Sequence, residues 1–147
     1  MSGAQAAAGV EPLPFPVRLR PIEDRDHEFL AALFAATRAA EFAAVPWDAA
    51  SKRAFLRQQF QFQHHHYVLH YPGAQLSLIE HEGGPIGRIY VARMPGEIRL
   101  MEIALIEAWR NRGLGAALVG ALLREAQDSG ACVTLHVEPD NPAVRFY

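Results

Sequence analysis

The sequence predicts a single α+β domain with a mixed, mostly antiparallel central sheet flanked by helices. Stretches with the alternating pattern of strands and stretches with the helical period follow one another along its 147 residues, of which 50% are hydrophobic. The later half contains apolar runs joined by short glycine-bearing turns, which is typical of neighbouring antiparallel strands. A chain of this length has enough apolar residues for one core and too few for two.

The first half of the chain predicts a tail, one strand and two helices. Residues 1–16 combine small residues with three prolines and show no periodicity, which predicts a flexible tail. Alternating positions predict a strand over residues 17–22, and the acidic run after it can begin a helix near Asp24. Asp48 is placed to cap a second helix, which the "YPG" of residues 71–73 ends. The apolar positions expected to face the core are Leu30, Leu33, Phe34, Leu56, Phe60 and Tyr67.

Residues 75–94 predict a β-hairpin. Two runs of strand-forming residues flank the turn "GGP", in which Gly83 and Gly84 supply the permissive backbone. A second turn at "PG" leads into residues 97–106, whose almost continuous apolar composition is expected of a strand covered on both faces. Three antiparallel strands are therefore expected after the two helices.

A strand–helix–strand crossover completes the predicted order. The helix follows residues 97–106, is closed by Gly130, and leads to a strand over residues 131–137. Residues 140–147 predict the start of a last helix, with Pro142 in its first turn. The expected apolar face of the crossover helix consists of Leu114, Ala117, Leu118, Ala121 and Leu122.

Composition and charge exclude several classes of protein. The formal net charge is −2 and the arginines are scattered, so the chain has no broad basic face for nucleic acid. Cys132 is the only cysteine, which excludes a disulfide framework and a cysteine-rich metal site and fits a reducing compartment. No apolar stretch has the roughly 20 residues of a membrane span, and the N-terminus lacks the pattern of a signal peptide. These observations predict a cytoplasmic protein with no nucleic-acid partner and no membrane partner.

The segment "RNRGLG", residues 110–115, places two arginines and two glycines between an apolar strand and a helix. The first N–H groups of that helix have no partner within it, and the helix dipole adds positive charge, so an anion can bind where glycines let it approach the backbone. A nucleotide-binding P-loop would need Lys followed by Ser or Thr where Ala116 and Ala117 stand. A dinucleotide-binding loop would need a third glycine where Leu118 stands. A glycine turn without any ligand is the structural alternative.

Arg110, Gly113 and Gly115 match in register the pyrophosphate-binding pattern of the GNAT superfamily of N-acetyltransferases. The order of elements from about Val17 onward resembles that family as well. The resemblance implies an acyl-CoA N-acyltransferase fold over residues 17–147, with acetyl-CoA as co-substrate. It also implies that the chain lacks C-terminal strands that relatives have. The loop residues expected to bind the cofactor are Arg110, Asn111, Arg112, Gly113, Leu114, Gly115 and Ala116.

The same resemblance assigns roles on the preceding strand. The backbone of Ile103, Ala104 and Leu105 is expected to pair with the pantetheine arm and to polarise the acetyl carbonyl. Glu102, the one ionisable residue of "LMEIALI", has apolar neighbours in the sequence and suits a general base for the amine. The alternative is a structural carboxylate that is satisfied by backbone or by an arginine.

Two residues near the C-terminal end complete the expected site. Tyr147 matches the family tyrosine that protonates the coenzyme A thiolate, or else it is an aromatic packing residue. Asn141 is expected to hydrogen-bond the pantetheine arm, to cap the last helix, or to do both. In "QHHHYVLH" only His66 and His70 share a helix face, so no metal site is expected.

The implied function is direct transfer of an acetyl group from acetyl-CoA to a primary amine of a small molecule or a peptide. Two alternatives are a non-catalytic acyl-CoA sensor and an interaction module that completes its sheet with a partner's strand. An unpaired strand edge over residues 132–137 also predicts either that the natural protein is longer or that this edge pairs with another protein or with another copy, as a homodimer.

Overall fold

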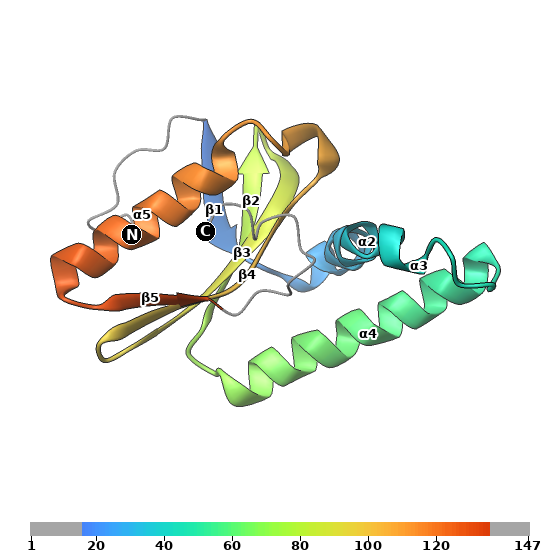
Figure 1. Ribbon diagram of the computed structural model, residues 1–147, viewed down its shortest axis with the longest axis horizontal. Coiled ribbons are helices and arrows are strands. Elements are labelled where there is room, and N and C mark those ends of the chain that lie inside the picture. The colour runs from blue at the N-terminus through green and yellow to red at the C-terminus, as the bar shows by residue number, and fades with distance from the viewer. Residues whose placement is uncertain (1–15, 136–147) are drawn as a thin grey trace.

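The computed structural model describes residues 16–135, which form one open five-stranded sheet with helices packed on it (Figure 1). The strands are β1 (Val17–Pro21), β2 (Gln75–His81), β3 (Gly84–Met94), β4 (Glu97–Leu105) and β5 (Cys132–Leu135). They lie in the sheet in the order β1-β2-β3-β4-β5. Neighbours pair antiparallel except β4 and β5, which a helical crossover makes parallel. The predicted mixed, mostly antiparallel α+β fold is confirmed.

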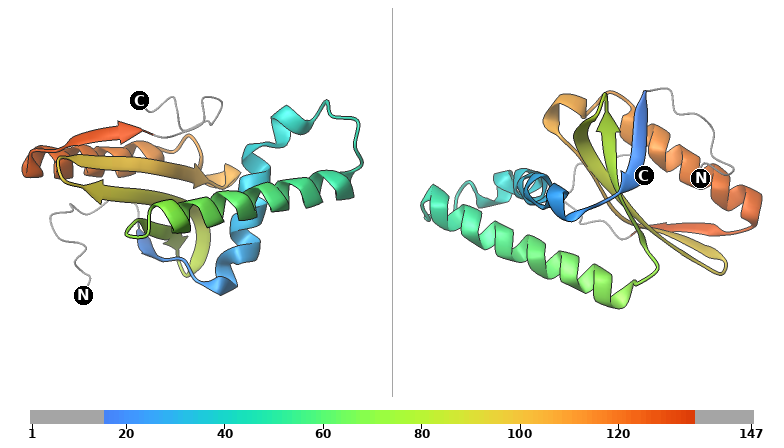
Figure 2. Two further views of the ribbon diagram at one scale, coloured as in Figure 1. Left: turned by 90° about the horizontal axis from the view of Figure 1, so that it is seen from below. Right: turned by 180° about the vertical axis from the view of Figure 1, so that it is seen from behind.

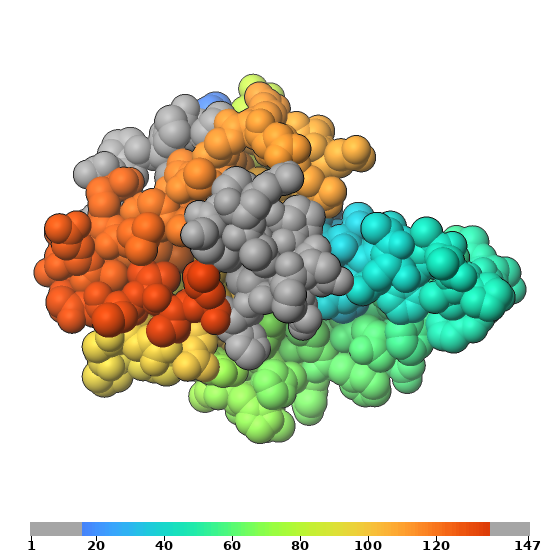
Figure 3. Space-filling model, in the orientation of Figure 1, coloured from blue at the N-terminus to red at the C-terminus, as the bar shows by residue number. Residues whose placement is uncertain are grey.

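Helices cover both faces of the sheet. They are α2 (His27–Thr37), α3 (Ala39–Phe42), α4 (Ala49–His70) and α5 (Leu114–Ser129), with 3-10 turns η1 (Asp24–Asp26) and η2 (Glu107–Trp109). α5 packs on one face, and α2 and α4 pack on the other (Figure 2). The ends of α2 and α4 that α3 connects project beyond the sheet as an arm (Figure 3). No helix within residues 16–135 is long and apolar enough to cross a membrane.

Local signals set most of these boundaries as predicted. The Asp48 side chain caps α4, because its Oδ1 accepts a hydrogen bond from the Ser51 backbone N–H at 2.7 Å. Gly130 ends α5 in the left-handed conformation, with φ of 72°. The role expected for Gly84 in the first hairpin turn was wrong. The left-handed residues there are Glu82 and Gly83, and Gly84 is already the first residue of β3.

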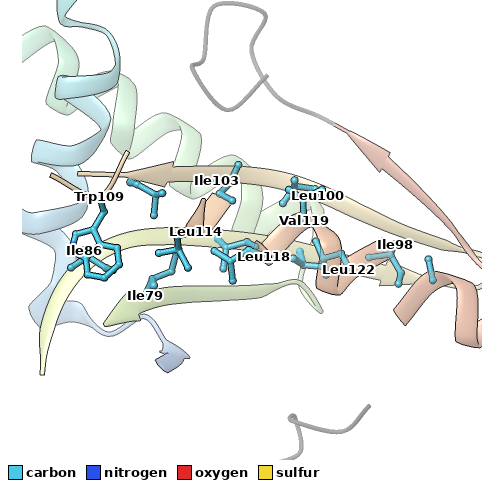
Figure 4. Packing of buried hydrophobic residues seen from close by; sticks show 14 residues of the cluster. Ile79, Ile86, Ile98, Leu100, Ile103, Trp109, Leu114, Leu118, Val119 and Leu122 are labelled. Carbon is cyan, nitrogen blue, oxygen red and sulfur yellow. The ribbon is translucent and has the colours of Figure 1, made fainter. Parts of the chain in front are cut away.

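The largest buried apolar cluster lies between the sheet and α5 (Figure 4). Side chains from β2, β3 and β4 meet one stripe of the helix there. Ala117 and Ala121, which the sequence placed on this stripe, are only half-buried, because the sheet contacts the helix further round its circumference. The buried residues of α5 are Leu114, Gly115, Leu118, Val119, Leu122 and Ala126.

The opposite face of the sheet packs against α2 and α4 through two smaller clusters. In the first, Leu78 of β2 contacts side chains of both helices. In the second, Tyr67 of α4 packs with Tyr90 of β3 and Met101 of β4. The helix positions predicted to face the core are all buried: Leu30, Leu33, Phe34, Leu56, Phe60 and Tyr67.

β1 is an edge strand, and an ion-pair cluster ties it to the rest of the domain. The Arg20 guanidinium donates to both carboxylate oxygens of Asp26 at 2.8 Å and to Glu80 at 2.8 Å. Asp26 and Glu80 are each only 6% exposed. Hydrogen bonding from Arg20, and then from the Glu23 backbone N–H, holds the pKa of Asp26 below its usual range. The cluster therefore joins β1, β2 and the start of α2.

β5 forms the other edge of the sheet within the described residues. It pairs with β4 from Cys132 opposite Glu97 to Leu135 opposite Leu100. Association through this edge stays a prediction. The predicted tail, apart from Pro16, and the predicted last helix fall in residues 1–15 and 136–147, which lie outside the described residues.

Replacing Asp26 by Asn should destabilise the fold in a pH-dependent way. A lowered carboxyl pKa stabilises the protein above the pKa of an unfolded aspartate, and this contribution is lost as pH falls through the folded-state pKa. We expect Asp26→Asn to lower the free energy of unfolding by roughly 2 kcal/mol at neutral pH, and the difference from wild type to shrink below about pH 4. Urea unfolding at a series of pH values measures both quantities. The exposed Asp128→Asn is the matched control, and an equal loss in the two variants would contradict the prediction.

Candidate active site

The loop between β4 and α5 adopts the backbone conformation expected of a phosphate-binding turn. β4 ends at Leu105, and after η2 the chain passes through Asn111, with φ of 61°, and Gly113, with φ of 90°. Both residues are left-handed, a region that glycine enters freely and asparagine enters more easily than most residues. Gly113 is also the N-cap residue of α5.

The N-terminus of α5 presents backbone N–H groups to its surroundings. Its first hydrogen bond runs from the Ala117 N–H to the Gly113 carbonyl oxygen at 3.0 Å. The N–H groups of Leu114, Gly115 and Ala116 precede that bond, and the N-cap residue, Gly113, has no side chain to cap them. With the positive end of the helix dipole behind them, these groups can bind phosphate oxygens.

Arg110 and Arg112 are anchored beside this terminus. Arg110 Nε donates to the Leu105 carbonyl oxygen at 2.9 Å, which ties the loop to the end of β4. The Arg112 guanidinium lies 4.2 Å from the centre of the Trp109 ring, a cation–π contact. Trp109, to which the sequence alone gives no role, is buried in the cluster beneath α5. It fixes one of the two loop arginines at the rim of the candidate phosphate site.

A bulge at Met101 decides which way Glu102 faces. Tyr90 of β3 lies opposite Glu102 and Val91 lies opposite Leu100, so Met101 has no opposite partner. Leu100 belongs to the cluster beneath α5. Met101 belongs to the cluster beneath α4, and Glu102 bonds to a residue of α4. Two consecutive side chains thus face the same helix.

Glu102 is 5% exposed and lies in a polar cluster between α4 and the sheet. Its Oε2 accepts a hydrogen bond from Gln63 Nε2 at 3.2 Å and lies 3.4 Å from Arg88 Nη2. Arg88 also donates to Gln63 Oε1 at 3.1 Å and to the Tyr90 hydroxyl at 3.3 Å. Glu102 thus has polar partners in the folded chain, although its neighbours in the sequence are apolar. Arg88 comes from the adjacent strand and Gln63 from α4, and neither is near Glu102 in the sequence.

His64 lies beside this polar cluster. Its ring stacks on Phe60 with 6.2 Å between centroids, and its Nδ1 is buried with no hydrogen-bond partner among the described residues. Burial lowers the pKa of His64, so the imidazole is neutral at neutral pH. The rings of His66 and His70 lie 4.5 Å apart, which confirms that these two share a helix face. Residues 16–135 contain no group of three side chains able to hold a metal ion.

The other expected cofactor contacts stay predictions. Ile103, Ala104 and Leu105 are all buried in β4, and β3 pairs with one edge of their backbone. β5 pairs with β4 only from Glu97 to Leu100, and the residues that follow β5 in the chain lie outside the described residues. Asn141 and Tyr147 also lie outside the described residues.

A hollow of about 550 Å³ lies at the corner between α3 and α4. None of its lining residues belongs to the loop after β4 or to the polar cluster around Glu102, so it does not define the candidate site. Its lining consists of Pro46, Trp47, Asp48, Ser51, Ala54, Phe55 and Gln58.

Comparison with known protein families agrees with the fold. The profile of the acetyltransferase (GNAT) family matches residues 26–147. The chain therefore belongs to the GNAT acetyltransferase family, whose members are acyltransferases that use acetyl-CoA as co-substrate. Among curated proteins, no sequence matches the chain.

Solved structures share this fold at low sequence identity. The PaiA N-acetyltransferase of Thermoplasma acidophilum, in complex with coenzyme A, has a TM-score of 0.59 and 13% identity, over 88% of this chain and 84% of that one. RimJ of Mycobacterium smegmatis, in complex with CoA-disulfide, has a TM-score of 0.58 and 16% identity, over 92% and 70%. Spermidine N-acetyltransferase of Vibrio cholerae, in complex with CoA and spermine, has a TM-score of 0.55 and 18% identity, over 90% and 78%. These likenesses show the fold alone.

Replacing Gly113 by Val should weaken coenzyme A binding. Valine is strained at the left-handed φ of Gly113, and its side chain would hold a phosphate away from the backbone. We expect a loss of affinity of roughly tenfold or more, measured by isothermal titration with coenzyme A. Gly120→Ala is the matched control, because the added Cβ would lie 3.7 Å from Arg124 Nη1, an ordinary contact. Unchanged affinity in a folded Gly113→Val protein would disprove the phosphate-loop assignment.

Proposed function

We propose that this protein transfers the acetyl group of acetyl-CoA directly to a primary amine of a small molecule or a peptide. Membership of the GNAT family supports the class of reaction and the co-substrate. The observation in this chain that carries the proposal is the arrangement along β4. A buried carboxylate, Glu102, faces α4, and three residues further on β4 ends and leads into the glycine-bearing turn before α5.

The turn before α5 is proposed to hold the pyrophosphate of acetyl-CoA. The backbone N–H groups at the start of α5 would bind its oxygens, and Arg110 and Arg112 would add positive charge at the rim. The pantetheine arm would lie along Ile103, Ala104 and Leu105, with Asn141 as a further contact. An extended arm that follows β4 backwards from the turn carries the thioester towards Glu102, which is why the two parts of the site belong together.

Two proton transfers are proposed, one from the amine nitrogen to Glu102 and one from Tyr147 to the thiolate of coenzyme A. Glu102 would accept a proton from the amine, directly or through water, as the nitrogen forms its bond to the acetyl carbon. Backbone N–H groups of β4 would stabilise the negative charge that develops on the carbonyl oxygen. As the carbon–sulfur bond breaks, Tyr147 would donate a proton to the departing thiolate, because a phenol with a pKa of about 10 still carries its proton near neutral pH. No covalent intermediate with the protein is needed.

The acceptor amine is proposed to approach from the side of α4. Glu102 faces that helix, whereas the opposite face of β4 is packed beneath α5. Small molecules and peptides both remain candidates for the acceptor. One of the compared structures is named for spermidine, which carries primary amines.

Thiol release from acetyl-CoA over a library of primary amines and N-terminal peptides tests the proposed function. Activity with an amine separates an enzyme from an acyl-CoA sensor or an interaction module. Glu102→Gln should lower turnover by roughly 100-fold near neutral pH and leave acetyl-CoA affinity nearly intact, because Glu102 acts on the amine. The exposed Asp128→Asn serves as control. If the pH–rate profiles of Glu102→Gln and wild type superimpose, Glu102 is not the base.

A further inference from the structure

We propose that Gln63 and Arg88 are positioning residues that hold the Glu102 carboxylate in place and set the pH range in which it accepts a proton. The proposal rests on the proposed function, in which Glu102 is the general base. Sequence reasoning gives neither residue a role. Both are identified by their contacts in the folded chain.

Each of the three side chains contacts the other two. Arg88 Nη2 lies 3.1 Å from Gln63 Oε1 and 3.4 Å from Glu102 Oε2, while Gln63 Nε2 donates to the same Glu102 oxygen at 3.2 Å. A guanidinium can only donate and a carboxylate can only accept, so the residue between them must do both. The Gln63 amide meets both requirements in one orientation only, with Oε1 towards Arg88 and Nε2 towards Glu102. Gln63 therefore fixes the distance and direction between the cation and the carboxylate.

Arg88 is held rigidly, although its surroundings do not satisfy all of its donors. It is 2% exposed, donates to the Tyr90 hydroxyl, and lies over the Tyr90 ring with 4.8 Å to the centroid. Its Nε is buried with no hydrogen-bond partner among the described residues. A buried ion pair with an unsatisfied donor is a poor way to stabilise a core, because the desolvation of both charges opposes folding. A role in controlling the protonation of Glu102 accounts for the presence of a buried arginine at position 88.

Gly87, the neighbour of Arg88 in β3, keeps this part of the sheet closely packed. A Cβ at Gly87 would collide with the Ala104 carbonyl oxygen and would lie 2.8 Å from Leu105 Cδ2. Glycine thus lets β3 approach β4 closely at the position next to Arg88. The guanidinium and the carboxylate are held by adjacent, tightly paired strands rather than by mobile loops.

Arg88 is the cation that faces Glu102 within the described residues. The other titratable groups around the pair come from β3, α4 and the turn before α2, and they are Tyr90, Tyr67, His64 and Asp26. Burial raises the pKa of Tyr90 and lowers the pKa of His64, so both are neutral near pH 7. Tyr67 packs edge-on against Tyr90, and Asp26 is already paired with Arg20. Removing Arg88 therefore removes a positive charge that lies beside the carboxylate.

Replacing either residue should shift the pH dependence of the reaction in a defined direction. A buried carboxylate that loses a donor or a cation binds its proton more tightly, so the acidic limb of the kcat/KM profile moves to higher pH. We expect a shift of about one pH unit for Arg88→Met, a smaller shift for Gln63→Leu, and partial recovery for Arg88→Lys, which keeps the charge. The KM for acetyl-CoA should not change. The matched controls are Gln61→Leu and Arg53→Met, two exposed positions of α4.

A second measurement separates this proposal from the proposed function. Carboxyl carbon NMR of protein labelled at glutamate, with the Glu102 signal assigned by its loss in Glu102→Gln, follows protonation of Glu102 without any turnover. If wild type releases no thiol with any amine, the proposed function fails, and the NMR titration still decides whether Gln63 and Arg88 control the carboxylate. Titration of Glu102 at the wild-type pH in folded Gln63→Leu would overturn the proposal. Gln63 is only half-buried, so Gln63→Leu decides the matter alone if Arg88→Met fails to fold.

Discussion

The bulge at Met101 is the constraint on which the candidate site depends. Side chains of a strand alternate between the two faces of a sheet, so one extra residue reverses the alternation for everything that follows. Before the bulge, Leu100 packs beneath α5, and after it Ile103 does the same. If the residues after Leu100 alternated strictly, Glu102 would point into that apolar cluster, where a carboxylate has no partner. With the bulge, the same strand supplies apolar side chains to one face and a carboxylate to the other.

The two faces of the sheet consequently differ in polarity. The face beneath α5 is apolar and packs continuously up to Trp109, so the helix and the turn before it are held firmly relative to β4. The face beneath α4 accommodates charge and hydrogen bonds beside its two smaller apolar clusters. In the proposed function, phosphate binding by the turn needs a rigid backbone, whereas proton transfer needs a carboxylate with fixed polar partners. One strand meets both needs because it lies between these two layers.

The buried ion pairs of the domain differ in what they contribute. Arg20 satisfies its carboxylate partners with short hydrogen bonds and joins β1 to β2 and α2, which is a structural task. Arg88 lies further from its carboxylate, at 3.4 Å, and an amide side chain mediates between them. Short, fully hydrogen-bonded pairs repay the loss of water better than long ones. The looser pair is therefore the one whose presence calls for a functional explanation.

The sequence determined the order of elements, the caps Asp48 and Gly130, and the position of the glycine-bearing turn, because alternation, helical period and turn chemistry are local properties. It also marked Glu102 as unusual within an apolar strand. The partners of Glu102 were decided only by tertiary structure, since Gln63 is 39 residues away in the chain and Arg88 reaches it through strand pairing. The same holds for the burial of Trp109 beneath α5 and for the buried stripe of that helix. Strand register and helix rotation are set by long-range packing, and no local pattern specifies them.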